Sequence, residues 1–244
     1  MRLPTPRPSE SFDDGPTTFE RMRFWSVTQW LIAVNVAAFM ADLLAKGAVN
    51  DCGDFSADRA IQRLQLWRIL TFQFLHANAL HLFFNMLWLY YLGPIVELRL
   101  GRGRYLAFYL LCGVAGPAMY LLLWKLGILI SGPDVPMVGA SAGIFGVMVG
   151  AMRIAPRMPV RLWLPPISLR LKTLVLIYVG IAAVIVYSSG ANAGGEAAHL
   201  GGAAAGFVLF RNVRWLGMFG PKRRERRFWR PGDPKSRFFR DDLD

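Results

Sequence analysis

Long apolar runs alternate with short polar segments along most of this chain of 244 residues. Six runs approach the length of about 20 residues that an α-helix needs to cross a membrane. They cover residues 25–44, 79–96, 105–130, 138–152, 171–188 and 197–210. A soluble protein would have to bury all six runs in one core. The pattern therefore predicts an all-α fold, a polytopic membrane protein built as a bundle of six transmembrane helices.

Polar segments flank this apolar region at both ends of the chain. Residues 1–24 are polar and rich in proline, and they lack the apolar stretch of a secretory signal. We expect them to form a disordered tail. Residues 25–213 would form one six-span domain, and residues 214–244 a second tail that is dense in arginine.

Positive charge is unequally divided between the two sides of the predicted bundle. Six spans place both tails on one side, together with the loops that follow the second and fourth spans. Of the 28 lysines and arginines, only five fall on the other side: Lys46, Arg59, Arg63, Arg68 and Lys125. Cytoplasmic loops carry the excess of Lys and Arg. Both termini are therefore predicted to be cytoplasmic, and the short loops favour a bacterial inner (plasma) membrane.

The net charge of +12 is concentrated in the C-terminal tail. Arginines beside a membrane span contact anionic lipid headgroups, so we expect lipid rather than nucleic acid to bind this tail. Cys52 lies in the first outer loop and Cys112 inside the third span, so the sequence predicts no disulfide, no metal site and no cofactor. It does not indicate an oligomeric state.

Four polar residues lie inside the predicted spans, where polar groups are costly and mark function. They are His81 and Asn85 in the second span, Ser141 in the fourth and His199 in the sixth. Counting ~1.5 Å per helical residue across a ~30 Å core places all four in the outer half of the membrane. Ser141 would lie roughly 10 Å below the outer surface. A common depth predicts one shared site.

Small residues predict close packing between the fourth and sixth spans. Gly202 and Gly206 share a helix face with His199, and the fourth span is similarly rich in glycine. Packing these faces together would bring His199 into contact with Ser141, which is the arrangement of a serine nucleophile and its base. The His81 ring, the Asn85 amide and the Ser141 backbone N–H could then donate to an oxyanion.

Each residue also has a simpler interpretation. A Gly-x-Ser-x-Gly sequence is common at helix contacts, and the soluble hydrolase form requires a preceding strand that this sequence does not indicate. His199 could be a structural histidine or could line the path of a small transporter. A transporter would usually show internal repeats or interrupted spans in matching positions of two halves, and neither is evident here.

Five short motifs fall in order along the predicted spans and loops. They are Trp67–Arg68 (WR), His81–Asn85 (HLFFN), Gly93–Gly101 (GPIVELRLG), Gly139–Gly143 (GASAG) and Ala198–Gly206 (AHLGGAAAG). Together they resemble the motifs of the rhomboid family of intramembrane serine proteases, in the same order and on the corresponding spans.

The resemblance implies a serine-type endopeptidase with a dyad and without a third, acidic member. Ser141 would be the nucleophile and His199 the general base, while His81, Asn85 and the Ser141 N–H would form the oxyanion hole. The supporting residues would be Gly139, Gly143, Phe145, Gly202 and Gly206. Substrates would be single transmembrane helices of other proteins, entering past the fifth span as a lateral gate and cut near their outer end. A relative that binds transmembrane helices without cutting them is the alternative.

Several further roles follow from these assignments. His199 has no evident carboxylate partner, so we expect Phe145, one turn after Ser141, to hold its ring by stacking. Glu97 lies at the cytoplasmic end and is interpreted as structural, through capping contacts. His76 is expected to take part in hydrogen bonding of the outer loop. Trp67 and Arg68 are expected to anchor that loop at the membrane interface.

Overall fold

The computed structural model describes residues 25–129, 132, 135–161 and 166–220. Each of the six apolar runs contains a helix. These helices are α2 (Val27–Leu44), α5 (Ala79–Leu100), α6 (Arg102–Lys125), α7 (Ser141–Ile154), α8 (Leu171–Tyr187) and α9 (Ala193–Arg211). The predicted tail 1–24 and residues 221–244 of the second tail lie outside the described residues.

Three of these helices meet the length and hydropathy that a membrane span requires. Within the described residues they are α2, α5 and α6, and α7 and α8 are shorter apolar helices. The sixth helix, α9, begins at Ala193, four residues before the expected run. It is rich in glycine and alanine. Close packing against its neighbours therefore stabilises α9 in the bundle more than its own hydropathy does.

Shorter elements join the six helices. Between α2 and α5 the chain forms α3 (Ala48–Gly53), the π-helical turn η1 (Asp58–Gln62), α4 (Arg68–Thr71) and the 3₁₀ turn η2 (Phe72–Phe74). Between α7 and α8 lies an antiparallel hairpin of β1 (Pro159–Arg161) and β2 (Ser168–Arg170), with Val160 opposite Leu169. The 3₁₀ helix η3 (Val213–Phe219) follows α9 and buries Leu216.

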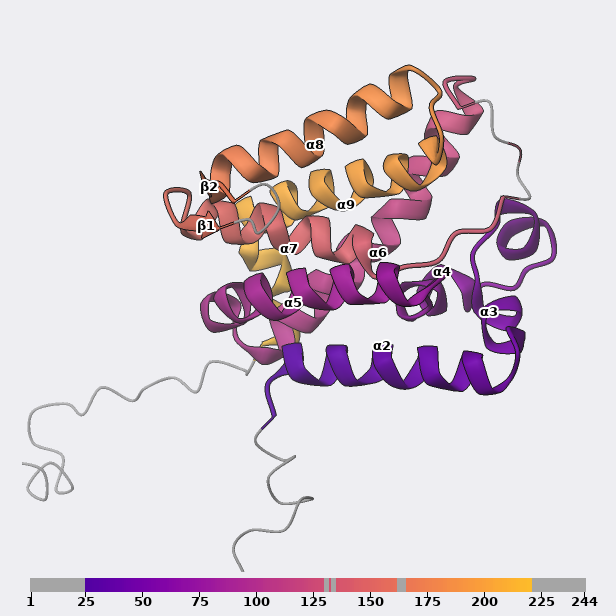
Figure 1. Cartoon of the computed structure of the whole chain (residues 1–244), viewed down its shortest axis with the longest axis horizontal. Coiled ribbons are helices and arrows are strands. Elements are labelled where there is room, and N and C mark those ends of the chain that lie inside the picture. The colour runs from indigo at the N-terminus through magenta and orange to yellow at the C-terminus, as the bar shows by residue number, and fades with distance from the viewer. Residues whose placement is uncertain (1–24, 130–131, 133–134, 162–165, 221–244) are drawn as a thin grey trace, which may run out of the picture.

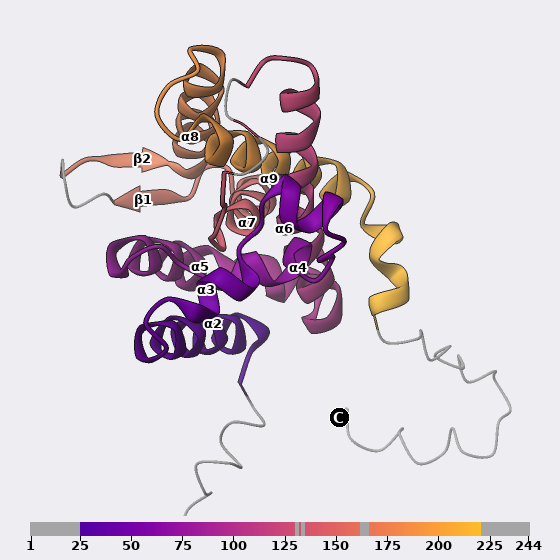
Figure 2. The same cartoon turned by 90° about the vertical axis from the view of Figure 1, so that its right-hand side faces the viewer.

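The helices form layers around α9. In Figure 1, α8, α9, α5 and α2 follow one another from top to bottom, with the β1–β2 hairpin at one end of the bundle and α3 at the other. The α9 helix packs against α6, α7 and α8, whereas α2 packs mainly against α5. Figure 2, which looks along the bundle, shows the hairpin projecting beside α5 and α8.

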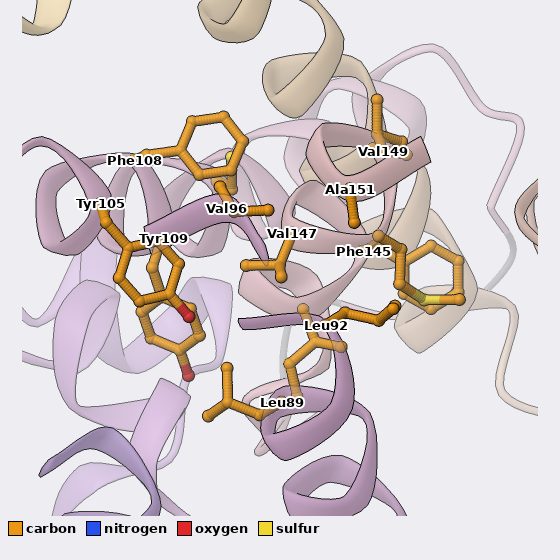
Figure 3. Packing of buried hydrophobic residues seen from close by; sticks show 14 of the residues in the cluster. Leu89, Leu92, Val96, Tyr105, Phe108, Tyr109, Phe145, Val147, Val149 and Ala151 are labelled. Carbon is orange, nitrogen blue, oxygen red and sulfur yellow. The ribbon is translucent and has the colours of Figure 1, made fainter. Parts of the chain in front are cut away.

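Buried side chains of α5, α6 and α7 form the main core. Figure 3 shows Leu89, Leu92 and Val96 of α5 facing Phe108 of α6 and Val147 of α7. A second cluster links the segment between α2 and α5 (residues 45–78, called the outer loop) to the ends of α6, α7 and α9. It includes Phe55, Phe72, Tyr120 and Ala142. Ser141 lies where the two clusters meet, because Ala140 belongs to the first and Ala142 to the second.

The outward faces of the bundle are strongly apolar. Exposed on α5 and α8 are Leu80, Phe83, Phe84, Leu87, Tyr90, Leu176, Ile177, Ile181 and Val184. Apolar surface of this extent is unfavourable in water and favourable against lipid acyl chains. This pattern agrees with a bundle that is embedded in a membrane.

Glu97 joins α5 to the start of α2. Its carboxylate accepts hydrogen bonds from the backbone N–H groups of Val27 (2.7 Å) and Thr28 (2.9 Å), and from the Thr28 hydroxyl (2.8 Å). These donors have no carbonyl partner within α2, and a carboxylate also complements the positive end of that helix. The structural role expected for Glu97 is confirmed.

Candidate active site

A cavity of about 570 Å³ lies at the end of the bundle that carries the outer loop. Ser141, His81 and His199 line it, from three different helices. The remaining wall consists mainly of small and apolar residues, with Ser189 and Asn192 as polar members: Ala77, Val135, Pro136, Met137, Val138, Ser189, Gly190, Asn192, Ala193, Gly194 and Gly195. The Ser141 hydroxyl and two imidazoles therefore share one cavity.

The Ser141 side chain contacts the His199 ring directly. The distance from Ser141 Oγ to His199 Nε2 is 2.8 Å, so the contact expected from the packing of the two spans is present. The other ring nitrogen, Nδ1, lies 2.8 Å from Glu196 Oε2. A carboxylate can only accept, which assigns the ring proton to Nδ1. Nε2 is then free to accept the hydroxyl proton of Ser141.

The expectation that His199 lacks a carboxylate partner is wrong. Glu196 lies three residues before His199, in the first turn of α9, and residues at this spacing are neighbours on a helix surface. The expected apolar run began at residue 197, so Glu196 fell just outside it, whereas α9 begins at Ala193. The i, i+3 spacing of Glu196 and His199 was the signal that could have found the pair.

Phe145 holds the His199 ring from one face. The two rings are stacked, with centroids 4.3 Å apart and planes inclined by 8°. Phe145 is buried and also meets Tyr178 of α8 edge-on at 6.3 Å. The stacking expected from the helical spacing is confirmed, and it limits rotation of the imidazole about its own axis.

Two glycines of α9 allow α7 to approach at backbone distance. A Cβ at Gly202 would lie 1.9 Å from the Ala142 carbonyl oxygen, and one at Gly206 would lie 2.6 Å from the Gly146 Cα. Gly143 does not take part in this contact, contrary to expectation. It faces α6, where a Cβ would lie 2.9 Å from the Tyr109 ring. The glycines of α7 therefore allow close contact with two helices, α6 at Gly143 and α9 at Gly146.

The chain enters α7 along a segment fixed by the outer loop. Met137 and Phe55 exchange backbone hydrogen bonds of 2.7 and 2.9 Å, and the Gly139 N–H donates to the Phe72 carbonyl at 2.9 Å. Gly139 has φ 137°, a conformation that side chains disfavour, and a Cβ there would lie 2.9 Å from the His81 ring. Ser141 is the first residue of α7, so its backbone N–H has no partner within the helix.

Helix α5 places His81 and Asn85 at different depths of the site. His81 lines the cavity next to Gly139, whereas Asn85, one turn further along α5, is buried and does not line it. Its Nδ2 atom has no hydrogen-bond partner among the described residues. The Asn85 amide is thus a donor that is available near the cavity and already removed from water.

His76 packs against His81 instead of joining the hydrogen bonds of the outer loop through its ring. The two rings meet edge-on with centroids 5.1 Å apart. Burial, with the His81 ring as a second cause, lowers the pKa of His76 to about 3. His76 is therefore neutral at physiological pH and acts as packing behind His81.

Arg68 organises the outer loop from within, which differs from the expected anchor at the membrane interface. Its buried guanidinium donates to the carbonyls of Asp51 (2.8 Å) and Asp54 (2.7 Å) and pairs with the Asp54 carboxylate. Trp67 is half-exposed, and its indole N–H donates to the Cys52 carbonyl at 3.1 Å. The Trp67–Arg68 motif therefore holds together the loop that fixes the approach to Ser141.

Comparison with known proteins agrees with this geometry. The family model described as a rhomboid domain matches residues 63–215. The chain belongs to the rhomboid family. Together with its apolar helices, this membership makes it an integral, multi-pass membrane protein. The match includes every residue that lines the cavity.

Similar rhomboid proteins come from several kinds of organism. "Rhomboid-like protease 3" of Toxoplasma gondii is 32% identical over 153 residues, which is 62% of this chain and 52% of that protein. "Rhomboid protease GluP" of Bacillus subtilis (strain 168) is 32% identical over 200 residues, 80% of this chain and 35% of that protein. "Rhomboid protease GlpG" of Serratia proteamaculans (strain 568) is 54% identical over 43 residues, 16% of that protein. This rhomboid chain thus spans about half the length of these relatives, or less.

The α7–α9 contact can be tested with Gly202→Ala. The added methyl group meets the Ala142 carbonyl, so the helices must separate and the Ser141–His199 distance must grow. A displacement of about 1 Å costs on the order of 100-fold in rate, and we expect that loss in labelling of Ser141 by a fluorophosphonate probe. Gly180→Ala on α8 is the matched control, because its Cβ points into open space. Equal labelling of both variants would contradict the packing argument.

Proposed function

We propose that this rhomboid protein is an intramembrane serine endopeptidase that hydrolyses peptide bonds in or near transmembrane helices of other membrane proteins. The observation that carries the proposal is the 2.8 Å contact between Ser141 Oγ and His199 Nε2 inside a shared cavity. Membership of a family whose similar members are named proteases supports the same reaction.

The proposed reaction proceeds through an acyl-enzyme. His199 Nε2 takes the hydroxyl proton as Ser141 Oγ attacks the scissile carbonyl carbon, which gives a tetrahedral intermediate. The C–N bond then breaks, and the imidazolium returns the proton to the leaving amine nitrogen. Water next attacks the ester with its proton passing to His199, and collapse of the second intermediate frees the carboxyl product and restores Ser141.

The developing oxyanion would be held by donors on two helices. The Ser141 backbone N–H lies at the start of α7, where the helix dipole also favours negative charge. His81 reaches the cavity from α5, and the buried Asn85 amide has an unused donor. Preorganised donors of this kind lower the barrier because they need no rearrangement as charge develops.

A six-crossing topology, which is part of the proposal, would put this site in the outer half of the membrane. In the proposal, residues 25–213 form the catalytic domain, both termini are cytoplasmic, and the basic tail contacts anionic lipid headgroups. Substrate helices would enter between α5 and α8, with α8 acting as the gate. These two helices make few contacts with each other, and Trp88 meets Tyr178 edge-on where they approach.

The dyad predicts that fluorophosphonate labelling of the detergent-solubilised protein depends on both of its members. We expect the wild type to be labelled, and Ser141→Ala and His199→Ala to lose labelling and also cleavage of a transmembrane substrate. Both variants should retain the wild-type unfolding temperature. Cleavage that survives in either folded variant would overturn the proposed dyad. A folded wild type that is neither labelled nor able to cleave would favour a rhomboid-like protein that binds helices without cutting them.

Asn85→Ala should weaken the reaction without abolishing it. Loss of one oxyanion donor reduces kcat about 100- to 1000-fold, and the remaining donors still act. Steady-state cleavage rates at saturating substrate would measure this effect. Asn85→Asp offers a contrasting charge at the same position and should be at least as impaired. A wild-type rate in Asn85→Ala would remove Asn85 from the oxyanion hole.

The topology predicts that the C-terminal tail is accessible only from the cytoplasmic side. Protease added to inside-out vesicles should remove an epitope placed after Asp244, while the same epitope should survive in right-side-out vesicles. Immunoblotting reports both results. Protection of the epitope in inside-out vesicles would reverse the proposed orientation.

A further inference from the structure

We propose that Glu196 is a positioning residue that completes a Glu196–His199–Ser141 relay. The proposal rests on the proposed protease function and adds a third, acidic member to its dyad. Its basis is one continuous set of contacts: Glu196 Oε2 lies 2.8 Å from His199 Nδ1, and His199 Nε2 lies 2.8 Å from Ser141 Oγ.

The helix itself fixes the carboxylate next to the ring. Glu196 and His199 are separated by one turn of α9, and the Glu196 N–H is bonded to the Asn192 carbonyl at 3.0 Å. The first turn of a helix favours negative charge, because its N–H groups and the helix dipole are positive there. The helix that carries His199 therefore also positions the Glu196 carboxylate, at an end where negative charge is stabilised.

The surroundings keep the pair from being screened by water. The side chains of Glu196 and His199 are only 18% and 17% exposed. Among the described residues, no lysine or arginine is paired with Glu196, so its contact with the ring is not shared with a competing cation. Partial burial makes a charged hydrogen bond stronger than its exposed counterpart.

The relay fixes two properties of the imidazole that the reaction needs. A carboxylate on Nδ1 selects the tautomer that leaves Nε2 unprotonated, and only that tautomer can accept the Ser141 proton. Once the proton has moved from Oγ to Nε2, the ring is a cation and the carboxylate lies beside it. Phe145 cannot supply either effect, since stacking restrains the ring plane but does not distinguish the two nitrogens.

The experiment compares Glu196→Gln and Glu196→Ala with Asp58→Asn in the full-length protein. Asp58 pairs with Arg63 in the outer loop and does not line the cavity, so it controls for loss of a carboxylate at the same end of the bundle. The first readout is the maximal rate of labelling by a fluorophosphonate, separated from the concentration that gives half of that rate. Unfolding temperatures check that each variant is folded.

We expect the maximal rate to fall about 10- to 100-fold in both Glu196 variants, the range for one charged hydrogen bond. The half-saturating concentration should stay within about twofold of wild type, because Glu196 acts through His199 and not on the probe. Asp58→Asn should label at the wild-type rate. A wild-type maximal rate in folded Glu196→Ala would overturn the proposal.

The second readout is the tautomer of His199, which a merely structural role would not change. The chain has three histidines, so ¹⁵N-histidine labelling gives few signals, and His76→Gln assigns one of them by its loss. Wild-type His199 should carry its proton on Nδ1, and Glu196→Gln should move part of the population to Nε2. An unchanged tautomer in Glu196→Gln would contradict the relay. Ser141→Ala separates the two proposals: if it still cleaves, the proposed serine mechanism fails, whatever the tautomer shows.

Discussion

The contact between the backbones of α7 and α9 is the constraint on which the site depends. Gly202 faces the Ala142 carbonyl and Gly206 faces Gly146 at distances that leave no room for a side chain. Apolar side chains gain little from leaving lipid for protein, so helices in a membrane associate through such close van der Waals contact. Because Ser141 lies one residue before Ala142, and His199 three before Gly202, this contact also sets the Ser141–His199 distance.

The outer loop supplies the second constraint on the same residues. The buried Arg68 ties that loop together, and the loop in turn bonds the segment from Met137 to Gly139 that leads into α7. The start of α7 is thus held from both directions, by α9 on one side and by the loop on the other. The first N–H groups of a helix have no partner within it, and in α7 they begin at Ser141, which lines the cavity.

Much of this arrangement could be predicted from the sequence, because it depends on hydropathy and on the spacing of residues along helices. The six helices and the stacking of Phe145 on His199 both follow from counting along helices. The rotation of each helix does not follow in the same way, and it decides that Gly143 faces α6 rather than α9. The burial of Arg68 depends on carbonyls of the outer loop, whose path has no periodic signal in the sequence.

Glu196 was missed for a different physical reason. The segment before Ala197 is polar and glycine-rich, which is typical of a loop, but α9 begins at Ala193 and places Glu196 on the same helix as His199. Glu97 and Glu196 then follow one rule, since each carboxylate lies at the positive end of a helix. The Glu97 carboxylate accepts hydrogen bonds from the first N–H groups of α2, whereas the Glu196 carboxylate contacts the imidazole of His199. The same electrostatic preference therefore stabilises the fold at one end of the bundle and orients the candidate base at the other.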